Sequence, residues 1–363
     1  MTLILTLNAG SSTLKAGLFQ AVDGTLRAVD RRTIEQPGDH AVGELLDWAQ
    51  ASRAGRLTGV GHRVVHGGMR FAEPVLINDE VLGALEALTP LAPLHQPRSL
   101  EAVRAIMAQR PELAQTACFD TAFHRTQPAV AGWLGLPRAL HDQGVRRYGF
   151  HGLSYQYVAE RMWTLEPALA GGRVVIAHLG SGASACAVRD GRSLDSSMGF
   201  SPLDGLLMGT RPGALDAGAV LYLLQHEGMS PAEVEDLLYR QCGLLGVSGV
   251  SADMRVLLAS QETAAREAVD LFVYRAAREI LALTVALGEL DGVVFTGGVG
   301  ENSPEIRARI CKRLRWIGLE LDPCANGAGG EARITHTDSP IRAWVVPTDE
   351  ELLIARQSQP LLG

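Results

Sequence analysis

The sequence predicts an α/β protein whose fold is duplicated, and three features carry this prediction. Short apolar segments of strand character alternate with segments of helical periodicity along the whole chain. At 363 residues, the chain is longer than one hydrophobic core usually organises, so we expect two domains. Two similar small-residue loops, one near residue 10 and one near residue 180, each follow a strand-like segment and begin a long α/β stretch.

The periodicity assigns the individual elements. Strands are expected at 3–7, 14–19, 60–65, 116–119, 174–179, 184–188, 292–296 and 341–346. Helices are expected at 79–88, 99–109, 264–290 and 349–357. A further helix should begin after Ser303, which supplies a cap, with Pro304 at its first position, and the glycines at 297–300 predict a turn before it.

The two loops also align with each other. Residues 7–12 match 179–184 with the leucine, one glycine and the last serine in register. Six residues are a weak repeat alone, but their places at the heads of two halves suggest a duplicated fold that faces a shared cleft.

Composition excludes several classes of protein. The net charge of −7 and the lack of a basic stripe argue against nucleic-acid binding. The five cysteines are odd in number and no pair has C-x-x-C spacing, so neither a disulfide framework nor a zinc site is expected. The chain shows no signal-peptide pattern and no uninterrupted apolar stretch of about 18 residues, so we expect a cytoplasmic protein without a membrane span.

Three loops have the composition of phosphate-binding sites. The stretch "NAGSSTLK" supplies small residues, hydroxyls and the cation Lys15, although for this stretch alone a polar hairpin turn is the better explanation. "HLGSGAS" is similar, and "FTGGVGENSPEIR" reads as strand, glycine turn and helix start. Together the three loops favour a nucleotide with several phosphates.

Charged residues stand in unusual places. Arg63 lies inside an apolar strand and Arg211 in a glycine- and proline-bounded loop, so each needs an anionic partner, either a structural carboxylate or a ligand. Asp120 directly follows a strand, where a carboxylate can meet Mg²⁺ or water. Glu350 begins the last helix, where favourable interaction with the helix dipole is the simpler explanation.

Nine ordered motifs resemble the acetate kinase family of short-chain carboxylate kinases, from about residue 3 to residue 356. They are "LNAGSSTLK", "GHRVVHGG", "LAPLHQP", "FDTAFH", "RRYGFHG", "MGFSPLDGLLMGTR", "GLLGVSGVSADMR", "FTGGVGENS" and "PTDEELLIAR". The resemblance implies the fold of acetate and sugar kinases, Hsp70 and actin, in which two related ribonuclease H-like domains surround a nucleotide cleft. It places the first domain at 1–121 plus 348–363 and the second, with the nucleotide and dimer contacts, at 122–347.

The resemblance also implies roles for individual residues. Catalytic roles fall to Asp120, His151, Arg211 and Arg63, and Arg63 also binds substrate. The apolar pocket for the acyl methyl is formed by Val65, Leu94, Phe150 and Pro202. Nucleotide contacts are Lys15, His178, Leu179, Gly180, Ser181, Gly182, Asp253, Met254, Arg255, Gly300, Glu301, Asn302 and Ser303. The metal-site residues are Asn8 and Glu350.

The implied activity is the Mg²⁺- or Mn²⁺-dependent phosphorylation of acetate by ATP, and the reverse transfer from acetyl phosphate to ADP, in a homodimer. Alternatives are a propionate or butyrate kinase of the same family, an Hsp70- or actin-like ATP-binding switch, and a degenerate member kept as a binding protein. Two departures from the family pattern bear on these alternatives: Ser181 replaces the usual asparagine, and Tyr155 stands where a second histidine often follows "GFHG".

Overall fold

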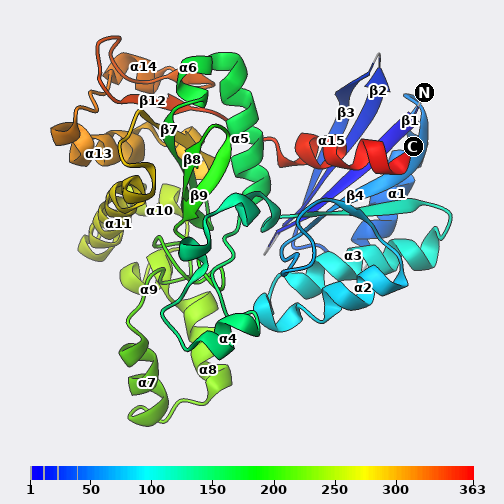
Figure 1. Ribbon diagram of the computed structural model, residues 1–363, viewed down its shortest axis with the longest axis horizontal. Coiled ribbons are helices and arrows are strands. Elements are labelled where there is room, and N and C mark those ends of the chain that lie inside the picture. The colour runs from blue at the N-terminus through cyan, green and yellow to red at the C-terminus, as the bar shows by residue number, and fades with distance from the viewer. Residues whose placement is uncertain (1, 11–12, 23, 39) are drawn as a thin grey trace. The chain divides into compact units, whose positions relative to one another are not determined.

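The computed structural model describes residues 2–10, 13–22, 24–38 and 40–363, and the chain divides into two compact units. The first unit comprises Met1–Arg125, His151–Tyr157 and Asp349–Gly363. The second comprises Thr126–Phe150 and Val158–Thr348. Each unit contains one mixed six-stranded sheet (Figure 1). The domain limits near residues 121 and 347 stay a prediction.

The sheet of the first unit has the strand order β3-β2-β1-β4-β6-β5. Its strands are β1 (Thr2–Ala9), β2 (Thr13–Val22), β3 (Thr25–Glu35), β4 (Arg56–Val64), β5 (Val75–Leu76) and β6 (Ala114–Phe119). Strands β1, β4 and β6 run parallel, whereas β2, β3 and β5 pair antiparallel with their neighbours. The three parallel strands therefore end at the same edge of the sheet.

The second sheet repeats this topology strand for strand, in the order β9-β8-β7-β10-β12-β11 when read from the equivalent edge. Its strands are β7 (Arg173–Leu179), β8 (Ala183–Arg189), β9 (Arg192–Ser196), β10 (Gly292–Thr296), β11 (Ala332–Arg333) and β12 (Arg342–Val345). Again the first, fourth and sixth strands in sequence order are parallel, and the others are antiparallel. The duplicated α/β fold expected from the sequence is confirmed.

Helices complete both units. The first contains α1 (Ala41–Ala51), α2 (Asp79–Glu86), α3 (Gln96–Gln109), the start of α5 (Gly152–Leu165) and α15 (Glu350–Leu362). The second contains α4 (Arg138–Asp142), α6 (Pro167–Ala170), α7 (Ala217–Gln225), α8 (Pro231–Asp236), α9 (Gly243–Ser248), α10 (Met254–Ala259), α11 (Thr263–Leu287), α12 (Gly297–Asn302), α13 (Pro304–Leu314) and α14 (Pro323–Gly327). In the described residues, no helix has both the length and the apolar character needed to cross a membrane.

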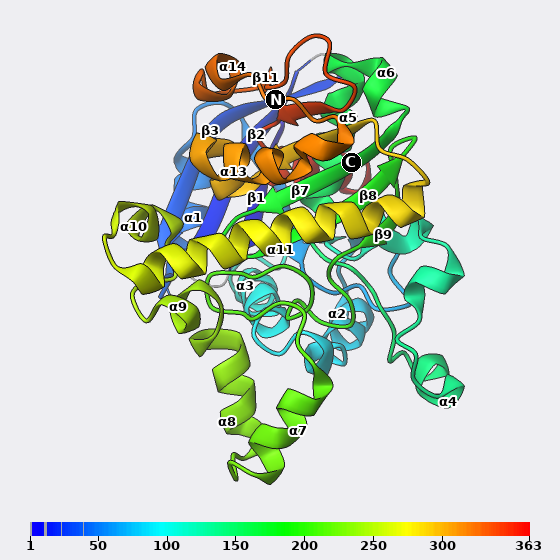
Figure 2. The ribbon, with the colours of Figure 1, turned by 90° about the vertical axis from the view of Figure 1, so that its left-hand side faces the viewer.

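Long helix α11 packs against the second sheet (Figure 2). The predicted helix at 264–290 is therefore confirmed, and its apolar stripe, from Val269 to Leu287, is buried. The predicted turn at 297–300 is wrong, because these glycines belong to helix α12. Gly297 makes the reversal with a φ of 77°, and the helix starts at the same residue.

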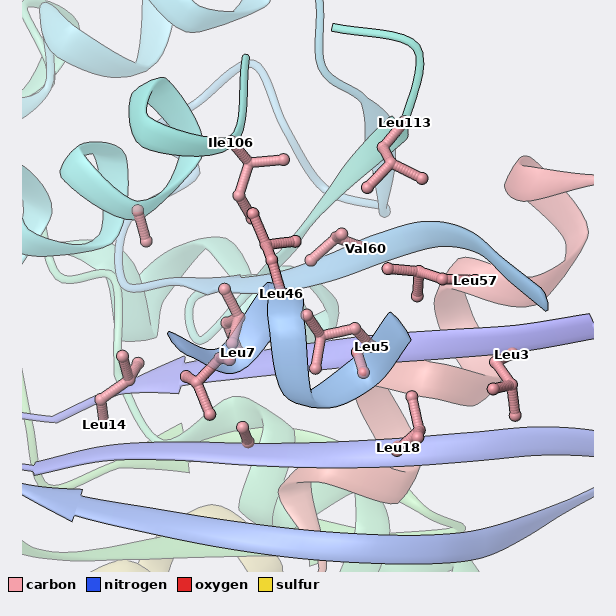
Figure 3. Close-up of a cluster of buried hydrophobic side chains, with 14 of the residues drawn as sticks. Leu3, Leu5, Leu7, Leu14, Leu18, Leu46, Leu57, Val60, Ile106 and Leu113 are labelled. Atoms are coloured by element: carbon pink, nitrogen blue, oxygen red, sulfur yellow. The ribbon is translucent and has the colours of Figure 1, made fainter. Parts of the chain in front are cut away.

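Alternation along β1 sends its side chains to two different faces of the first sheet. Leu3, Leu5 and Leu7 enter a buried apolar cluster with residues of α1 and α3 (Figure 3). The intervening residues therefore face α15, which packs against β1, β2, β4 and β6. Asn8 is the last of them, so a polar side chain reaches the α15 face where β1 ends.

Small residues on β4 bring α15 close to the sheet. A methyl group on Gly61 would lie 2.3 Å from Ser358 Oγ and 2.8 Å from the Cγ2 atom of Ile354, both on α15. A methyl group on Gly59 would meet the side chain of Leu362 at 2.5 Å. Arg63 continues this same face of β4, so the close approach of α15 fixes the distance between its first turn and Arg63.

We expect Gly61→Ala to lower the stability of the first unit by about 1–3 kcal/mol, because the added methyl has no space between β4 and α15. Gly83→Ala is the matched control. Gly83 lies in α2 with nothing within 4 Å of its would-be Cβ, so alanine should be neutral or stabilising by roughly 0.5–1 kcal/mol. Urea unfolding followed by circular dichroism measures both variants, and equal midpoints for the two would contradict the close-packing argument.

Candidate active site

Polar side chains from four elements of the first unit meet where its parallel strands end. Asn8 comes from β1, Arg63 from β4 and Asp120 from the residue after β6, while Glu350 and Glu351 form the first turn of α15. Hydrogen bonds connect all five side chains. The structure therefore brings together four residues predicted for catalysis or metal binding, and it adds Glu351.

Arg63 is the centre of this cluster. Its Nε donates to both carboxylate oxygens of Asp120, at 3.0 and 3.1 Å, and its Nη2 lies 2.6 Å from Asp120 Oδ2. Its Nη1 donates to Asn8 Oδ1 at 3.1 Å. The Arg63 side chain is 13% exposed and that of Asp120 is 1% exposed. The anionic partner that Arg63 requires is thus Asp120, in a fork geometry that lysine could not reproduce.

Asn8 connects this ion pair to α15. Its Nδ2 donates to Glu350 Oε2 at 2.8 Å and to Glu351 Oε1 at 3.0 Å, while its Oδ1 accepts from Arg63. One amide therefore orients two carboxylates on one side and a guanidinium on the other.

The cluster carries more negative than positive charge. Among the five hydrogen-bonded side chains, three carboxylates face one guanidinium. Outside them, Lys15 is close enough to Glu351 to favour its ionised form, and Arg31 Nη1 lies 3.9 Å from Glu351 Oε2. Burial raises the pKa of Glu351, and the neighbouring charge of Glu350 raises it further. Burial also raises the pKa of Asp120, against the opposing effect of Arg63. Burial acts to lower the pKa of Arg63, but the charges of Asp120, Glu350 and Glu351 and the hydrogen bonds to Asp120 together outweigh this and hold that pKa above its usual value.

The donor set fits a divalent cation. Mg²⁺ in proteins is typically held by one or two carboxylates, with substrate phosphates and water completing the octahedron. Half-buried Glu350 and buried Glu351 lie side by side on Asn8, and excess negative charge at this place is what a cation would offset. No group of three or more His, Cys, Asp or Glu side chains suited to a metal occurs among the described residues, so most of the coordination would fall to other ligands.

His151 adjoins the cluster through the backbone. Its amide hydrogen-bonds the Asp120 carboxylate and lowers the pKa of that group. His151 has a φ of 59°, a left-handed conformation that is uncommon for a non-glycine residue and often found at functional sites. The next residue, Gly152, donates its N–H to the carbonyl of Asp120 at 2.9 Å, and a Cβ there would meet that oxygen at 2.1 Å. Only glycine lets α5 begin this close to Asp120.

The other residues predicted for the first unit lie around this cluster. Lys15 pairs with Asn8 across the β1–β2 hairpin, and its side chain is exposed. Val65 follows β4 and is 2% exposed, whereas Leu94 is half-buried before α3. Ser11 and Ser12 of the predicted phosphate loop lie outside the described residues. The flanking residues of that loop border a cavity of about 560 Å³ against α1 and α3, away from the α15 face.

In the second unit, the predicted nucleotide segments meet around the loop that follows β7. Gly209 N donates to the carbonyl of Ser181 at 2.9 Å, and a Cβ on Gly209 would lie 3.3 Å from both Ser181 Oγ and the carbonyl of Ala252. The "LGSG", "MGTR" and "SAD" segments therefore touch at Gly209. Ser181, shorter than the family's asparagine, occupies this contact.

Helix α12, which begins with the glycines at 297–300, also lies against the β7 loop. A Cβ on Gly297 would meet the carbonyl of Leu179 at 2.9 Å, and a Cβ on Gly180 would lie 3.9 Å from the amide of Gly298. His178, half-buried at the end of β7, pairs with Thr296 of β10. Gly180 and Gly182 close the hairpin with an N–H to carbonyl bond of 3.0 Å.

The polar residues at the end of α12 and the start of α13 bind backbone groups. Glu301 Oε1 accepts from the amides of Gly297 and Thr348, at 2.9 and 3.1 Å. Asn302 donates to the carbonyl of Gly298 at 2.9 Å, and Ser303 caps α13 as expected. These side chains hold the shape of the α12 segment, and their contact with a nucleotide stays a prediction.

The remaining predicted residues of the second unit are also located. Asp253 caps α10 and pairs with the strongly exposed Arg255. Met254, the residue between them in the sequence, is buried. Arg211 Nη1 donates to the carbonyl of buried Pro202 at 2.7 Å. Phe150 is buried in the same unit.

Two residues that support these sites, Glu351 and Arg307, are not among those predicted from the sequence. Glu351 is not among the predicted residues, although it follows Glu350 in the same acidic first turn of α15. Arg307, 1% exposed, donates from Nη1 to the carbonyls of Gly300 and Glu301, at 2.9 and 2.8 Å, and so stabilises the end of α12. Tyr155, in place of the family's second histidine, is fully buried against the rings of Phe123 and His124.

Two α/β units of identical topology, each with polar loops where its parallel strands end, define a duplicated α/β fold with a polar site in each half. The sequence pattern of the Acetokinase family matches residues 28–356. An acetate kinase of Rhodopseudomonas palustris is 49% identical over 384 residues, covering 97% of this chain and 96% of the relative.

The crystal structure of Porphyromonas gingivalis acetate kinase has a TM-score of 0.87, 34% identity and full coverage of both chains. That of a propionate kinase from Francisella tularensis has a TM-score of 0.88 and 36% identity, covering 99% of this chain and 100% of its own. The chain belongs to the acetokinase family.

Two buried histidines next to the cluster generate a pH dependence. His62 precedes Arg63 and contacts Gln115 Oε1 at 2.7 Å, and burial lowers the pKa of His62 to about 4. Burial also lowers the pKa of His66 to about 4. Both imidazoles are therefore neutral in the folded protein at pH 5, whereas those of the unfolded chain are largely protonated below about pH 6.5.

We expect stability to fall as the pH drops from 7 to 5, because the unfolded state then binds protons that the folded state does not. Each histidine contributes about 2 kcal/mol to this loss. Replacing one of them by His62→Asn should remove about half of the dependence, as measured by urea unfolding at both pH values. An undiminished pH dependence in the variant would contradict this assignment.

Proposed function

We propose that the protein is an acetate kinase that transfers the γ-phosphoryl group of ATP directly to acetate, and from acetyl phosphate to ADP in reverse. The observation that carries the proposal is the buried Arg63–Asp120 pair joined through Asn8 to Glu350. It combines a site for anion recognition with carboxylates suited to a cation. Identity of 49% with an acetate kinase along nearly the whole chain supports the same activity.

The chemistry explains why cations dominate the proposed machinery. Acetate is already a competent nucleophile, so the main obstacles are repulsion between two anions and the charge on the moving phosphoryl group. Arg63 would bind the carboxylate or the transferred group, and His151 and Arg211 would stabilise the transition state. Asp120 would act as the catalytic carboxylate, and it also holds Arg63 in place.

A divalent cation completes this proposal. We assign it to Asn8 and Glu350, next to Glu351, with Mg²⁺ or Mn²⁺ as the ion. When bound, the cation neutralises phosphate charge and orients the nucleotide. Asn8 keeps the two glutamates side by side, whereas Glu350 is the more accessible of the two.

The nucleotide and acyl contacts follow the family motifs. We assign the nucleotide to Lys15, 178–182, 253–255 and 300–303, and the acyl methyl to Val65, Leu94, Phe150 and Pro202. Contacts of Gly209 with Ser181 and Ala252, and of Gly297 with Leu179, support grouping the three segments of the second unit. The domains would divide at 121 and 347.

We further propose that the chain works as a cytoplasmic homodimer with contacts in the second unit. Helix α7 supports this assembly: its sequence AGAVLYLLQ is largely apolar, yet none of its residues is buried. Leu221 and Tyr222 on this helix are about half exposed, at 52% and 53%. Analytical sedimentation tests the assembly, and a monomer at micromolar concentration would reject it.

Propionate is the second candidate substrate, favoured by the likeness to the Francisella propionate kinase. A single methylene changes the free energy of binding by only about 1–3 kcal/mol in an apolar pocket. Partial activity with the longer acid is therefore expected even for an acetate kinase.

We expect ADP formation from Mg-ATP to be strongly stimulated by acetate and to fade from propionate to butyrate. A coupled assay with the three acids and a control without acid measures this. Faster turnover of propionate would change the substrate and keep the mechanism. ATP hydrolysis independent of any acid would reject the proposal and favour an ATP-binding switch.

We expect Arg211→Ala to lower kcat at least about a thousandfold, since a transition-state arginine contributes about 10³–10⁵ in phosphoryl transfer. Arg240→Ala is the matched control in the same unit. Arg240 is 62% exposed and pairs with Asp236 of its own helical segment, so its loss should leave kcat within about twofold. Near-normal kcat in the Arg211 variant would remove this residue from the catalytic machinery.

A further inference from the structure

Three consecutive acidic residues begin α15. Their mutual repulsion has to be offset by positive charge in addition to the helix dipole. Asp349 caps the helix, since its Oδ1 accepts from the amide of Leu352 at 3.0 Å. Glu350 and Glu351 follow within the same turn and share the amide of Asn8. Like charges this close repel each other, and the Glu350 charge contributes to the raised pKa of Glu351.

Arg31 supplies positive charge to this turn from strand β3. Its Nη2 lies 2.5 Å from Asp349 Oδ2, and its Nη1 lies 3.9 Å from Glu351 Oε2. The hydrogen bond to Asp349 raises the pKa of Arg31, with a smaller contribution from Glu351. Arg31 therefore contacts the cap and the second glutamate, the residues on either side of Glu350.

The register of β3 determines which face of the sheet the Arg31 side chain occupies. Arg31 pairs with Gly17 of β2, which in turn pairs with Thr6 of β1, so it lies on the α15 face of the sheet. Its guanidinium rests over the ring of Phe19 at 5.6 Å. The residues beside it point the other way: Arg32 stacks over Trp48 of α1 at 4.9 Å.

We propose that Arg31 is a positioning residue, which holds the first turn of α15 so that Glu350 and Glu351 present their carboxylates to the divalent cation. This inference rests on the proposed function for the identity of the cation site. Its structural part, the restraint of α15 by Arg31, stands on the contacts with Asp349 and Glu351 alone.

Arg31→Gln tests the proposal, with Arg32→Gln as a matched control on the same strand and the opposite face. Hydrogen exchange of the Leu352 and Leu353 amides reports the restraint of the first turn. Electron paramagnetic resonance of Mn²⁺ in the presence of ADP reports cation affinity. We expect about three- to fivefold faster exchange and about three- to fivefold weaker Mn²⁺ binding in Arg31→Gln, with neither changed in Arg32→Gln.

Kinetics separate positioning from general damage. In Arg31→Gln, the Mg²⁺ concentration for half-maximal rate should rise by the same factor, whereas kcat at saturating Mg²⁺ stays within about twofold of wild type. Arg31→Lys should recover part of the Mn²⁺ affinity. Asp349→Asn keeps the capping oxygen, and adding Arg31→Gln to it should cost less than in the wild-type background.

Several results would overturn the proposal. These are unchanged exchange and Mn²⁺ affinity in Arg31→Gln, equal effects of Arg31→Gln and Arg32→Gln, or a wild-type protein that does not bind Mn²⁺ with ADP. If the wild-type protein shows no acetate-stimulated turnover, the proposed function is rejected instead. The exchange and Mn²⁺ measurements need no turnover, so the two failures are distinguishable.

Discussion

The Arg63–Asp120 ion pair is the interaction on which the rest of the first unit's site depends. A guanidinium in the middle of a sheet has to be compensated, because an unpaired charge there would cost several kcal/mol. Asp120 provides the compensation, and its own burial is made tolerable by Arg63 and the His151 amide. The same pair sets the orientation of Asn8, and through Asn8 that of both glutamates on α15. The proposed sites for an anion and for a cation thus share one buried contact.

That contact is reached only because the face of the sheet beneath α15 is lined by small residues. Gly59 and Gly61 leave no side chain between β4 and the helix. On β6, Thr116 Oγ1 donates to Ser358 Oγ at 2.6 Å, and Cys118 packs in a cluster with Ile354. Because these side chains are small or absent, α15 lies close to the sheet and its acidic first turn reaches the ends of β1, β4 and β6. The small residues of β4 and β6 therefore allow α15 to pack closely and also place its acidic first turn next to Arg63.

Local patterns explain which features were accessible to sequence reasoning. The hairpins at the head of each sheet, the long amphipathic α11 and the Ser303 cap were predictable because alternation, helical spacing and capping are short-range signals. The glycines at 297–300 misled, since their composition suggests a turn, whereas a carboxylate from Glu301 stabilises a short helix there. Glu351 follows Glu350 in the same helical turn, but its contact with Asn8 is a tertiary one. Arg31 could not be assigned, because its role depends on the register of β3 and on a helix more than 300 residues away in the chain. Family motifs marked Asn8, Arg63, Asp120 and Glu350, but not the hydrogen bonds that join them.

The distance of 342 residues between Asn8 and Glu350 has a consequence for biosynthesis. Domains generally fold as units while the chain is made, at about 5–20 residues per second, and the amino-terminal one usually folds first. Here the first sheet emerges early but lacks the helix that covers one of its faces, and its acidic cluster is missing two of its three carboxylates. For many seconds of translation the nascent chain holds Arg63 and Asp120 on an uncovered sheet, while the second unit is synthesised in full. The ribosome therefore delivers the pieces of this site in an order that makes it the last part of the protein to assemble.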